Sequence, residues 1–277
     1  MTVEKVEQEN THDVEIEDCE MERFVNSRVT QYVPGEPLAT KPVHIRYPLR
    51  KPWRSYTEKP YWDKRYDERL QHTSELGGTK DDDEWYGSGS LSGYLIKRSL
   101  ASLEHPEIRR ILHLGCGLSK LGEELAQLFP NAKRVTNLDF SGRAIRYWQT
   151  MDTIGEYIEG DVTDMRSIVP AQTQQLVVDK ACFDGLTNES AEQMLLEVCR
   201  VLSSEAIFIC ISSSRRMLTR ALNRIEAREA WTVGKLVYAT DIKQYRTDKD
   251  DDYVYVHVCQ NIMPGSRNVS EQIELGS

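Results

Sequence analysis

Three glycines close together, Gly115, Gly117 and Gly122, carry the strongest chemical signal in this 277-residue sequence. They have the spacing GxGxxxxG, follow an apolar run at 110–114, and have Cys116 between the first two. Glycine lets a backbone turn tightly and approach a ligand closely. The helix expected after the loop favours an anionic group at its N-terminus. We therefore expect a ligand-binding loop at this position.

The spacing of this loop excludes two common phosphate-binding motifs. It lacks the third glycine of the dinucleotide pattern GxGxxG, and it lacks the GK[ST] ending of a P-loop. A GxG turn alone is also a frequent helix start, so the loop by itself identifies no cofactor.

An acidic residue ends the next predicted strand, at 134–139. Asp139 follows Gly117 by 22 positions, where a doubly wound sheet places a carboxylate that accepts hydrogen bonds from ribose hydroxyls. We include its neighbour Phe140 in the predicted binding site. The alternative role of Asp139 is to cap the helix expected from Ser141, which itself has the residue type of an N-cap.

Two later strands also end in carboxylates. Asp161 ends the third predicted strand, where it can meet an adenine amino group while Val162 lies against the ring; its alternative role is that of a turn residue. Asp179 and Lys180 end the fourth strand, and the carboxyl ends of central strands line the ligand crevice of such sheets. The alternative for Asp179 and Lys180 is that they pair with each other or with a helix end.

Strand and helix patterns alternate between these acids. We predict strands at 110–114, 134–139, 156–161, 175–180, 205–212, 231–238 and 253–260, and helices at 121–129, 141–150, 190–202 and 214–227. This alternation predicts an α/β fold with a Rossmann-like, doubly wound, mostly parallel seven-stranded sheet. Only a polar loop joins the last two strands, which is short for a crossover helix, so the sheet is expected to end in an antiparallel pair.

Composition divides the chain into four parts. Residues 1–40 are acidic with few aromatics and are predicted to be a disordered extension. Residues 41–105 are predicted to form an N-terminal arm and lid, 106–264 the main domain, and 265–277 a flexible tail. The basic, aromatic beginning of the arm is expected either to pack on the domain or to face a substrate.

Bulk properties narrow the classes of partner and compartment. The net charge of −9 argues against a general affinity for nucleic acid or anionic membranes. No run of 18 apolar residues is present, and the acidic start has neither a signal-peptide nor a transit-peptide pattern. The six cysteines lack metal-binding spacing and are interpreted as reduced thiols. We expect a cytoplasmic protein, with the nucleus as alternative, and no metal.

The glycine loop and the three strand-end acids, in this order, resemble those of the class I (seven-stranded) S-adenosylmethionine-dependent methyltransferases, over roughly 60–262. Four short motifs sharpen the resemblance: YWDKRY at 61–66, EWYG at 84–87, LGCG at 114–117 and DKACFD at 179–184. Together they are similar to the elongation-factor-1A lysine methyltransferases and their dual lysine/N-terminal relatives. Leu118 and the segment ACF depart from that pattern, which often has Asn after LGCG and reads DKGTLD.

The resemblance implies S-adenosylmethionine as the cofactor. The residues that would hold it or cover its methionine end are Tyr61, Trp62, Arg65, Trp85, Tyr86, Gly115, Cys116, Gly117, Asp139, Phe140, Asp161, Val162 and Asp179. For catalysis we select Asp179 to orient an acceptor amine, and Phe183 and Trp85 as walls of an aromatic channel. Burial in such a channel lowers the pKa of a lysine ammonium, which must lose a proton before methyl transfer.

Three functions stay open at this point. The first is methylation of a protein lysine or N-terminal amine, with a translation elongation factor as a candidate protein substrate. The second is methylation of a small-molecule acceptor at nitrogen, oxygen or sulfur on the same fold. The third is a non-catalytic binding partner, which the altered DKACFD segment motivates.

Overall fold

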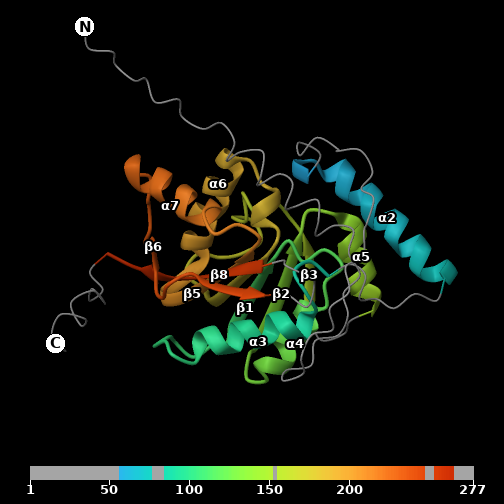
Figure 1. The fold of residues 1–277 in the computed structure, drawn as a ribbon, viewed down its shortest axis with the longest axis horizontal. Coiled ribbons are helices and arrows are strands. Elements are labelled where there is room, and N and C mark those ends of the chain that lie inside the picture. The colour runs from blue at the N-terminus through green and yellow to red at the C-terminus, as the bar shows by residue number, and fades with distance from the viewer. Residues whose placement is uncertain (1–55, 77–83, 152–154, 247–252, 265–277) are drawn as a thin grey trace, which may run out of the picture.

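The computed structural model describes residues 56–76, 84–151, 155–246 and 253–264 (Figure 1). The predicted extension at 1–40, the beginning of the arm and the tail at 265–277 lie outside these ranges. Within the described ranges, no helix combines the length and the apolar character that crossing a membrane requires.

One mixed sheet of eight strands forms the centre of the molecule (Figure 1). Its parallel part has the order β3-β2-β1-β4-β5. The bounds are β1 Arg110–Leu114, β2 Arg134–Asp139, β3 Glu156–Glu159, β4 Gln174–Lys180 and β5 Leu202–Ser212. The chain winds from β1 toward β3 on one side and from β4 toward β5 on the other. This reversal puts a crevice at the carboxyl ends of β1 and β4.

The far edge of the sheet is antiparallel, as predicted. Strand β8, Tyr253–Ile262, pairs with β5, and β6, Lys235–Tyr238, pairs with the opposite edge of β8. A further strand, β7 at Lys243–Arg246, also pairs with β8. The sequence suggests only a polar loop here, because KQYR contains a single residue, Tyr245, that packs on the core. The sheet therefore has eight strands rather than seven.

Helices cover both faces of the sheet (Figure 1). Their bounds are α2 Lys59–Leu76, α3 Gly89–Leu100, α4 Leu121–Leu128, α5 Gly142–Met151, α6 Asn188–Val201 and α7 Met217–Ala227. Helices α3 and α4 pack on one face, and α6 and α7 on the other. Helix α3 falls within the predicted arm and lid, yet its Leu95 and Ile96 are fully buried in the core.

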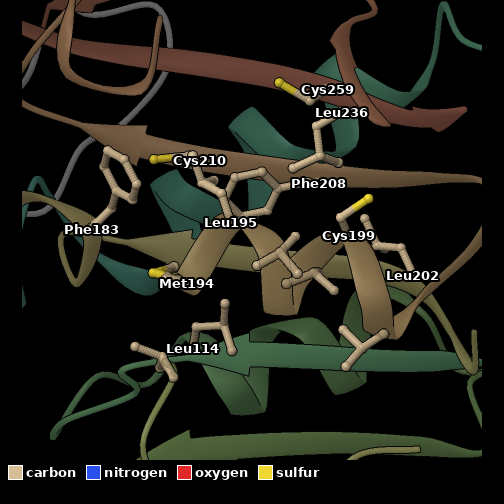
Figure 2. Packing of buried hydrophobic residues seen from close by; sticks show 14 of the residues in the cluster. Leu114, Phe183, Met194, Leu195, Cys199, Leu202, Phe208, Cys210, Leu236 and Cys259 are labelled. Atoms are coloured by element: carbon tan, nitrogen blue, oxygen red, sulfur yellow. The ribbon is translucent and has the colours of Figure 1, made fainter. Parts of the chain in front are cut away.

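Strand β5 shows why the central strands have continuous apolar sequences. Ile207 and Ile209 point to the face that α3 and α4 cover, whereas Phe208 and Cys210 point to the face of α6. Successive side chains alternate between faces, and both faces of a parallel sheet are buried. Figure 2 shows Phe208 and Cys210 packed with Leu195 on the second face.

Phe183, predicted to line an acceptor channel, lies in this core instead. It begins a short 3₁₀ turn at Phe183–Gly185 and is fully buried among the apolar residues of the α6 face (Figure 2). Because the ring is fully buried in this core, its surroundings fit support of the loop after β4 rather than a wall of an acceptor channel.

Asp179 also points into the protein. It is fully buried, and its carboxylate accepts hydrogen bonds from Phe183 N at 3.0 Å and from Cys210 Sγ at 3.3 Å. Burial, reinforced by the negative charge of Asp184, raises the pKa of Asp179 to about 8. The position of Asp179 on the Val177 side of β4 directs it to the α6 face, so neither predicted role, binding of cofactor nor orientation of an amine, fits its contacts.

This buried carboxyl makes the stability of the protein depend on pH. A pKa near 8 in the folded state exceeds the ordinary value of 3.8, so the folded state binds the proton more tightly, and its stabilisation is lost as pH rises toward 8. We expect the free energy of unfolding to fall by about 1 kcal/mol per pH unit between pH 6 and 8.

Asp179→Asn should flatten that dependence in chemical denaturation at several pH values. The exposed Asp164, whose pKa is lowered by Arg166, supplies the control, since Asp164→Asn should keep the slope. An equal slope in the wild type and Asp179→Asn would show that another group titrates.

Candidate active site

A hollow opens at the carboxyl ends of β1, β2 and β4, and its free space, counted out to the open mouth, is about 1060 Å³. The glycine loop, the ends of β2, β3 and β4, and the N-terminal segment all contribute to its walls. The lining residues are 115–119, Asp139, Phe140, 160–163, 180–182, Gly185, Leu186 and Ser190, together with Tyr56, Thr57, Trp62, Arg65, Tyr66 and Trp85.

Gly115 and Gly117 have to be glycine because other side chains lie too close to leave room for a Cβ atom. Gly115 has φ +58° and Gly117 has φ +48°, both in the left-handed region that glycine tolerates best. A Cβ on Gly115 would collide with Cys182, and a Cβ on Gly117 would lie 2.6 Å from Tyr66 Oη. The loop is therefore wedged between β4 and α2 at the floor of the hollow.

The backbone amides of this loop donate to acceptors within the protein. Gly117 N donates to Asp139 Oδ2 at 2.8 Å, and Ser119 N to Cys116 O at 3.0 Å. Lys120 N, at the start of α4, donates to Glu84 Oε1 at 2.7 Å, so a protein carboxylate occupies the anion position of this helix. A phosphate-free ligand fits such a loop, whereas a dinucleotide pyrophosphate would need these amides.

Asp139 has the position and the spare acceptors for a ribose. Its two oxygens accept Gly117 N and Ser141 N, each at 2.8 Å, which leaves each oxygen a second lone pair toward the hollow that it lines. Burial raises the pKa of Asp139 to about 6, against the opposing effects of these two amides and of Lys59. The contact with Ser141 N is a turn contact before α5, which begins at Gly142, so it does not amount to the capping role considered from the sequence.

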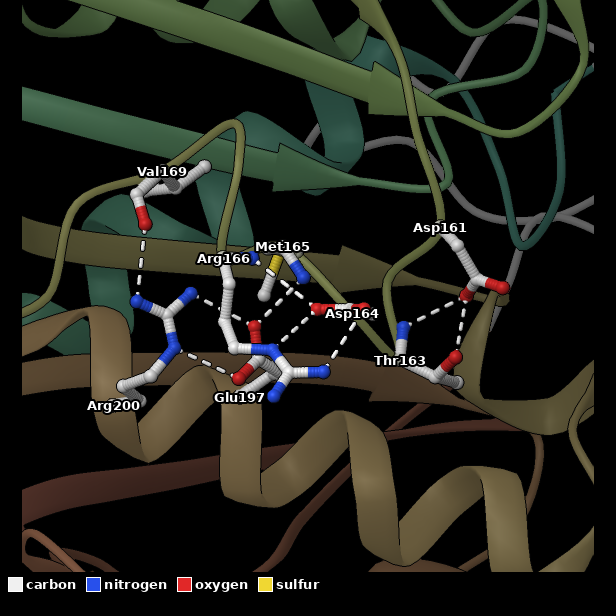
Figure 3. A network of polar contacts seen from close by, with 8 residues as sticks. All are labelled: Asp161, Thr163, Asp164, Met165, Arg166, Val169, Glu197 and Arg200. Carbon is white, nitrogen blue, oxygen red and sulfur yellow. Dashed lines mark hydrogen bonds and ion pairs between the residues drawn. The ribbon is translucent and has the colours of Figure 1, made fainter.

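Asp161 and Val162 form the side wall of the hollow. Asp161 Oδ1 accepts Thr163 N at 2.8 Å and Thr163 Oγ1 at 2.7 Å, which is the turn role considered from the sequence. The carboxylate itself stays exposed, and its other oxygen points away from Thr163 (Figure 3). Buried Val162 supplies an apolar surface beside it. An exposed acceptor next to an apolar wall suits an adenine.

Helix α6 holds this wall in place. Glu197 accepts Met165 N at 2.7 Å, while Arg200 bonds to Glu197 and donates to Val169 O at 3.1 Å (Figure 3). These contacts connect the loop after β3 to a helix that packs on the sheet, so several hydrogen bonds hold this side of the hollow.

Helix α2 closes the ribose side through residues spaced four apart. Lys59 Nζ contacts Phe140 O and Glu159, and Ser141 Oγ donates to Asp63 Oδ1 at 2.6 Å. Asp67 pairs with Arg143 of α5 at 3.2 Å. This polar face is not among the predicted site residues, although its i, i+4, i+8 spacing is present in the sequence.

Aromatic rings and one arginine form the remaining wall. The Trp62 and Trp85 ring centroids are 6.0 Å apart, and Arg65 Cζ lies 5.9 Å from the first and 5.5 Å from the second. Trp62 Nε1 donates to Tyr56 O at 2.7 Å, which orients the indole. These distances are within the range of a cation–π contact.

Most predicted site residues meet in the hollow, namely Trp62, Arg65, Trp85, Gly115, Cys116, Gly117, Asp139, Phe140, Asp161 and Val162. Four do not line it. Asp179 and Phe183 lie in the core, Tyr86 is buried with its hydroxyl on Asp184, and Tyr61 packs edge-on against Tyr56 with centroids 5.2 Å apart.

Residues outside the predicted set also line the hollow, and Tyr66 and Lys180 are two of them. Tyr66 follows Trp62 by one helical turn, so the same YWxxRY segment contains its signal. Lys180 was read as a pairing partner of Asp179, but its contact is with Glu84, which is distant in sequence. Within the described ranges, no group of three or more His, Cys, Asp or Glu side chains is arranged to hold a metal ion.

Comparisons with known proteins agree with this geometry. Residues 111–205 match a family described as a methyltransferase domain. The human eEF1A lysine and N-terminal methyltransferase is 28% identical over 202 residues, which cover 67% of this chain and 26% of that protein. The mitochondrial citrate synthase-lysine N-methyltransferase of Danio rerio is 27% identical over 172 residues, 56% of this chain and 66% of that protein. The chain thus spans about a quarter of the first relative.

A solved structure with a similar fold is a TehB-like SAM-dependent methyltransferase from Corynebacterium glutamicum. It has a TM-score of 0.49 and 15% identity, covering 73% of this chain and 99% of that one.

The doubly wound sheet, the phosphate-free glycine loop and the strand-end acids define a nucleoside-binding site of the Rossmann-like type. Together with the match of residues 111–205 to a methyltransferase domain, this arrangement is the one expected of class I S-adenosylmethionine-dependent methyltransferases, and it indicates S-adenosylmethionine as the cofactor.

Asp139→Asn should weaken binding of S-adenosylhomocysteine at least tenfold, about 1.4 kcal/mol, because an amide cannot accept both backbone amides and the ribose hydroxyls. In the wild type, affinity should also fall as pH drops below 6, where the raised pKa of Asp139 lets the carboxylate take up a proton. Isothermal titration calorimetry measures both effects.

Glu156→Gln, at the opposite end of β3, is the control and should bind normally. Unchanged affinity in Asp139→Asn would refute the ribose assignment.

Gly117→Ala should lower the melting temperature and weaken S-adenosylhomocysteine binding. The new methyl group meets Tyr66 Oη at 2.6 Å on a backbone with φ +48°. Adding Tyr66→Phe to Gly117→Ala should recover part of the loss, because it removes the colliding hydroxyl. If the double variant loses stability additively, the contact with Tyr66 is not the constraint.

Proposed function

We propose that the chain transfers a methyl group from S-adenosylmethionine to the amine of a protein lysine. The observation that carries this proposal is the composition of the wall beyond the nucleoside acids. Its acidic lining residues are Asp139 and Asp161, both on the ribose and adenine side. The methyl end is formed by Trp62, Trp85 and the segment 180–182.

The two named relatives support a protein amine as acceptor. Both are called lysine methyltransferases, and one is also called an N-terminal methyltransferase. We propose a protein substrate on this likeness, with a translation elongation factor as a first candidate. The cytoplasm remains the compartment that we expect from the sequence. We also retain the proposed division into an arm and lid at 41–105 and a catalytic domain at 106–264, with the difference that α3 of the first part packs in the core of the second.

When bound, S-adenosylmethionine would supply a methyl group activated by its sulfonium, to which a neutral amine could form an N–C bond as the C–S bond breaks and S-adenosylhomocysteine leaves. The chain contributes alignment and exclusion of water. Asp139 orients the ribose, and Asp161 with Val162 orients the adenine. Trp62 and Trp85 enclose the acceptor in an aromatic surrounding, and burial there lowers the pKa of an ammonium. No general base is assigned, because Asp179 faces the core.

Incubation with tritium-labelled S-adenosylmethionine and cell lysate tests the proposal. We expect one or a few labelled protein bands, and we expect them to disappear when lysate amines are blocked beforehand by acetylation, which removes the nucleophilic lone pair. Asp139→Asn protein, as the matched control, should label them weakly. Label confined to the acid-soluble fraction would contradict a protein substrate and favour a small-molecule acceptor.

A further inference from the structure

The segment 84–87, which carries Trp85 into the hollow, is fixed by two buried polar anchors. Glu84 precedes the tryptophan and is 5% exposed, and Tyr86 follows it and is 2% exposed. Trp85 itself is half-buried and lines the hollow beside Arg65 and Trp62. The ring therefore faces the site while both neighbours are held inside the protein.

The first anchor is a buried ion pair between Glu84 and Lys180. Their side chains are only 2% and 1% exposed. The same carboxylate accepts Ser119 Oγ at 2.8 Å and Lys120 N at 2.7 Å. Glu84 thus joins three segments, the tryptophan segment, the glycine loop and the end of β4, and the last two line the hollow.

The second anchor holds a strained backbone. Tyr86 has φ +59°, which is an outlier for a bulky side chain. Its hydroxyl donates to Asp184, which also accepts Ser212 Oγ at 2.5 Å and Ser213 N at 2.8 Å. Strain of this kind persists where surrounding contacts over-determine the conformation, and it concentrates at functional sites.

Stability alone does not account for such an arrangement. A buried ion pair is often no more stabilising than well-packed apolar side chains of similar volume, and the loss of one partner leaves an uncompensated charge. Here the pair fixes the position of the Trp85 segment relative to the glycine loop and to the end of β4 at Lys180.

We propose that Glu84 and Lys180 are positioning residues for methyl transfer, and that their ion pair, with Tyr86 and Asp184 as second anchor, sets the Trp85 ring against the reacting end of the hollow. This inference rests on the proposed function, because it assigns the acceptor end to Trp85. Neither charged residue takes part in the chemistry; both act through the position of the indole.

Three variants and one control test the role: Glu84→Gln, Lys180→Met, the double variant, and Glu192→Gln. Glu192 is a mostly buried carboxylate that pairs with the more exposed Arg224 and Arg228, and it lies outside the hollow. The double variant leaves no unpaired charge, so it should fold even if a single variant does not. Each protein is also made with Trp85→Phe, so that subtraction isolates the fluorescence of Trp85.

We expect Glu84→Gln and Lys180→Met to shift Trp85 emission to longer wavelength and to lower kcat at least tenfold. The affinity for S-adenosylhomocysteine should change less than kcat. The double variant should regain melting temperature but neither the emission nor kcat. Glu192→Gln should lose stability while keeping both.

Two results would overturn the inference. One is a Trp85 emission in Glu84→Gln that matches the Glu192→Gln control. The other is a double variant that recovers kcat together with stability, which indicates a purely structural pair. Absence of both cofactor binding and methyl transfer in the wild type would instead reject the proposed function, and the emission measurement would still decide whether the ion pair positions Trp85.

Discussion

The buried carboxylate of Asp139 is the constraint on which the site depends. With one oxygen it holds Gly117 N and with the other Ser141 N, so it closes the glycine loop against the end of β2. Ser141 in turn donates to Asp63 and brings α2 over the hollow. A carboxylate in this low-dielectric position needs such donors, because burial alone disfavours its charge. The donors that Asp139 requires therefore set the positions of the glycine loop and of the start of α5 on this side of the hollow.

A second carboxylate has the corresponding role at the other end of the loop. Glu84 occupies the N-terminus of α4 and pairs with Lys180. Because protein carboxylates take up the amides of Gly117 and Lys120, the loop accommodates a nucleoside without phosphate. The acids that remain open to the hollow gather on the ribose and adenine side, and rings line the opposite end. This separation of acidic and aromatic walls is the feature on which the proposed methyl transfer to an amine rests.

Sequence patterns predicted the sheet well because its central strands are short apolar runs between glycine or acid boundaries. The strands at 110–114 and 134–139 have the observed bounds, and the antiparallel edge was anticipated. Strand β7 was not, because an edge strand with one packed residue has almost no apolar periodicity; its pairing with β8 forms it. Helix α2 closes the hollow through polar contacts. The sequence of the helix alone does not indicate them, because their partners lie elsewhere in the chain.

By itself the sequence determined the glycine loop and the acids that end the strands, because glycine spacing and strand ends are local properties. Tertiary structure decided where the side chains of the DKACFD segment point. Helices cover both faces of the sheet, so the alternation of side chains along β4 does not reveal which residues at its end are buried and which line the hollow. Asp179 and Phe183 are buried on the face that α6 covers. Lys180 lines the hollow, where it pairs with Glu84, 96 residues earlier in the chain.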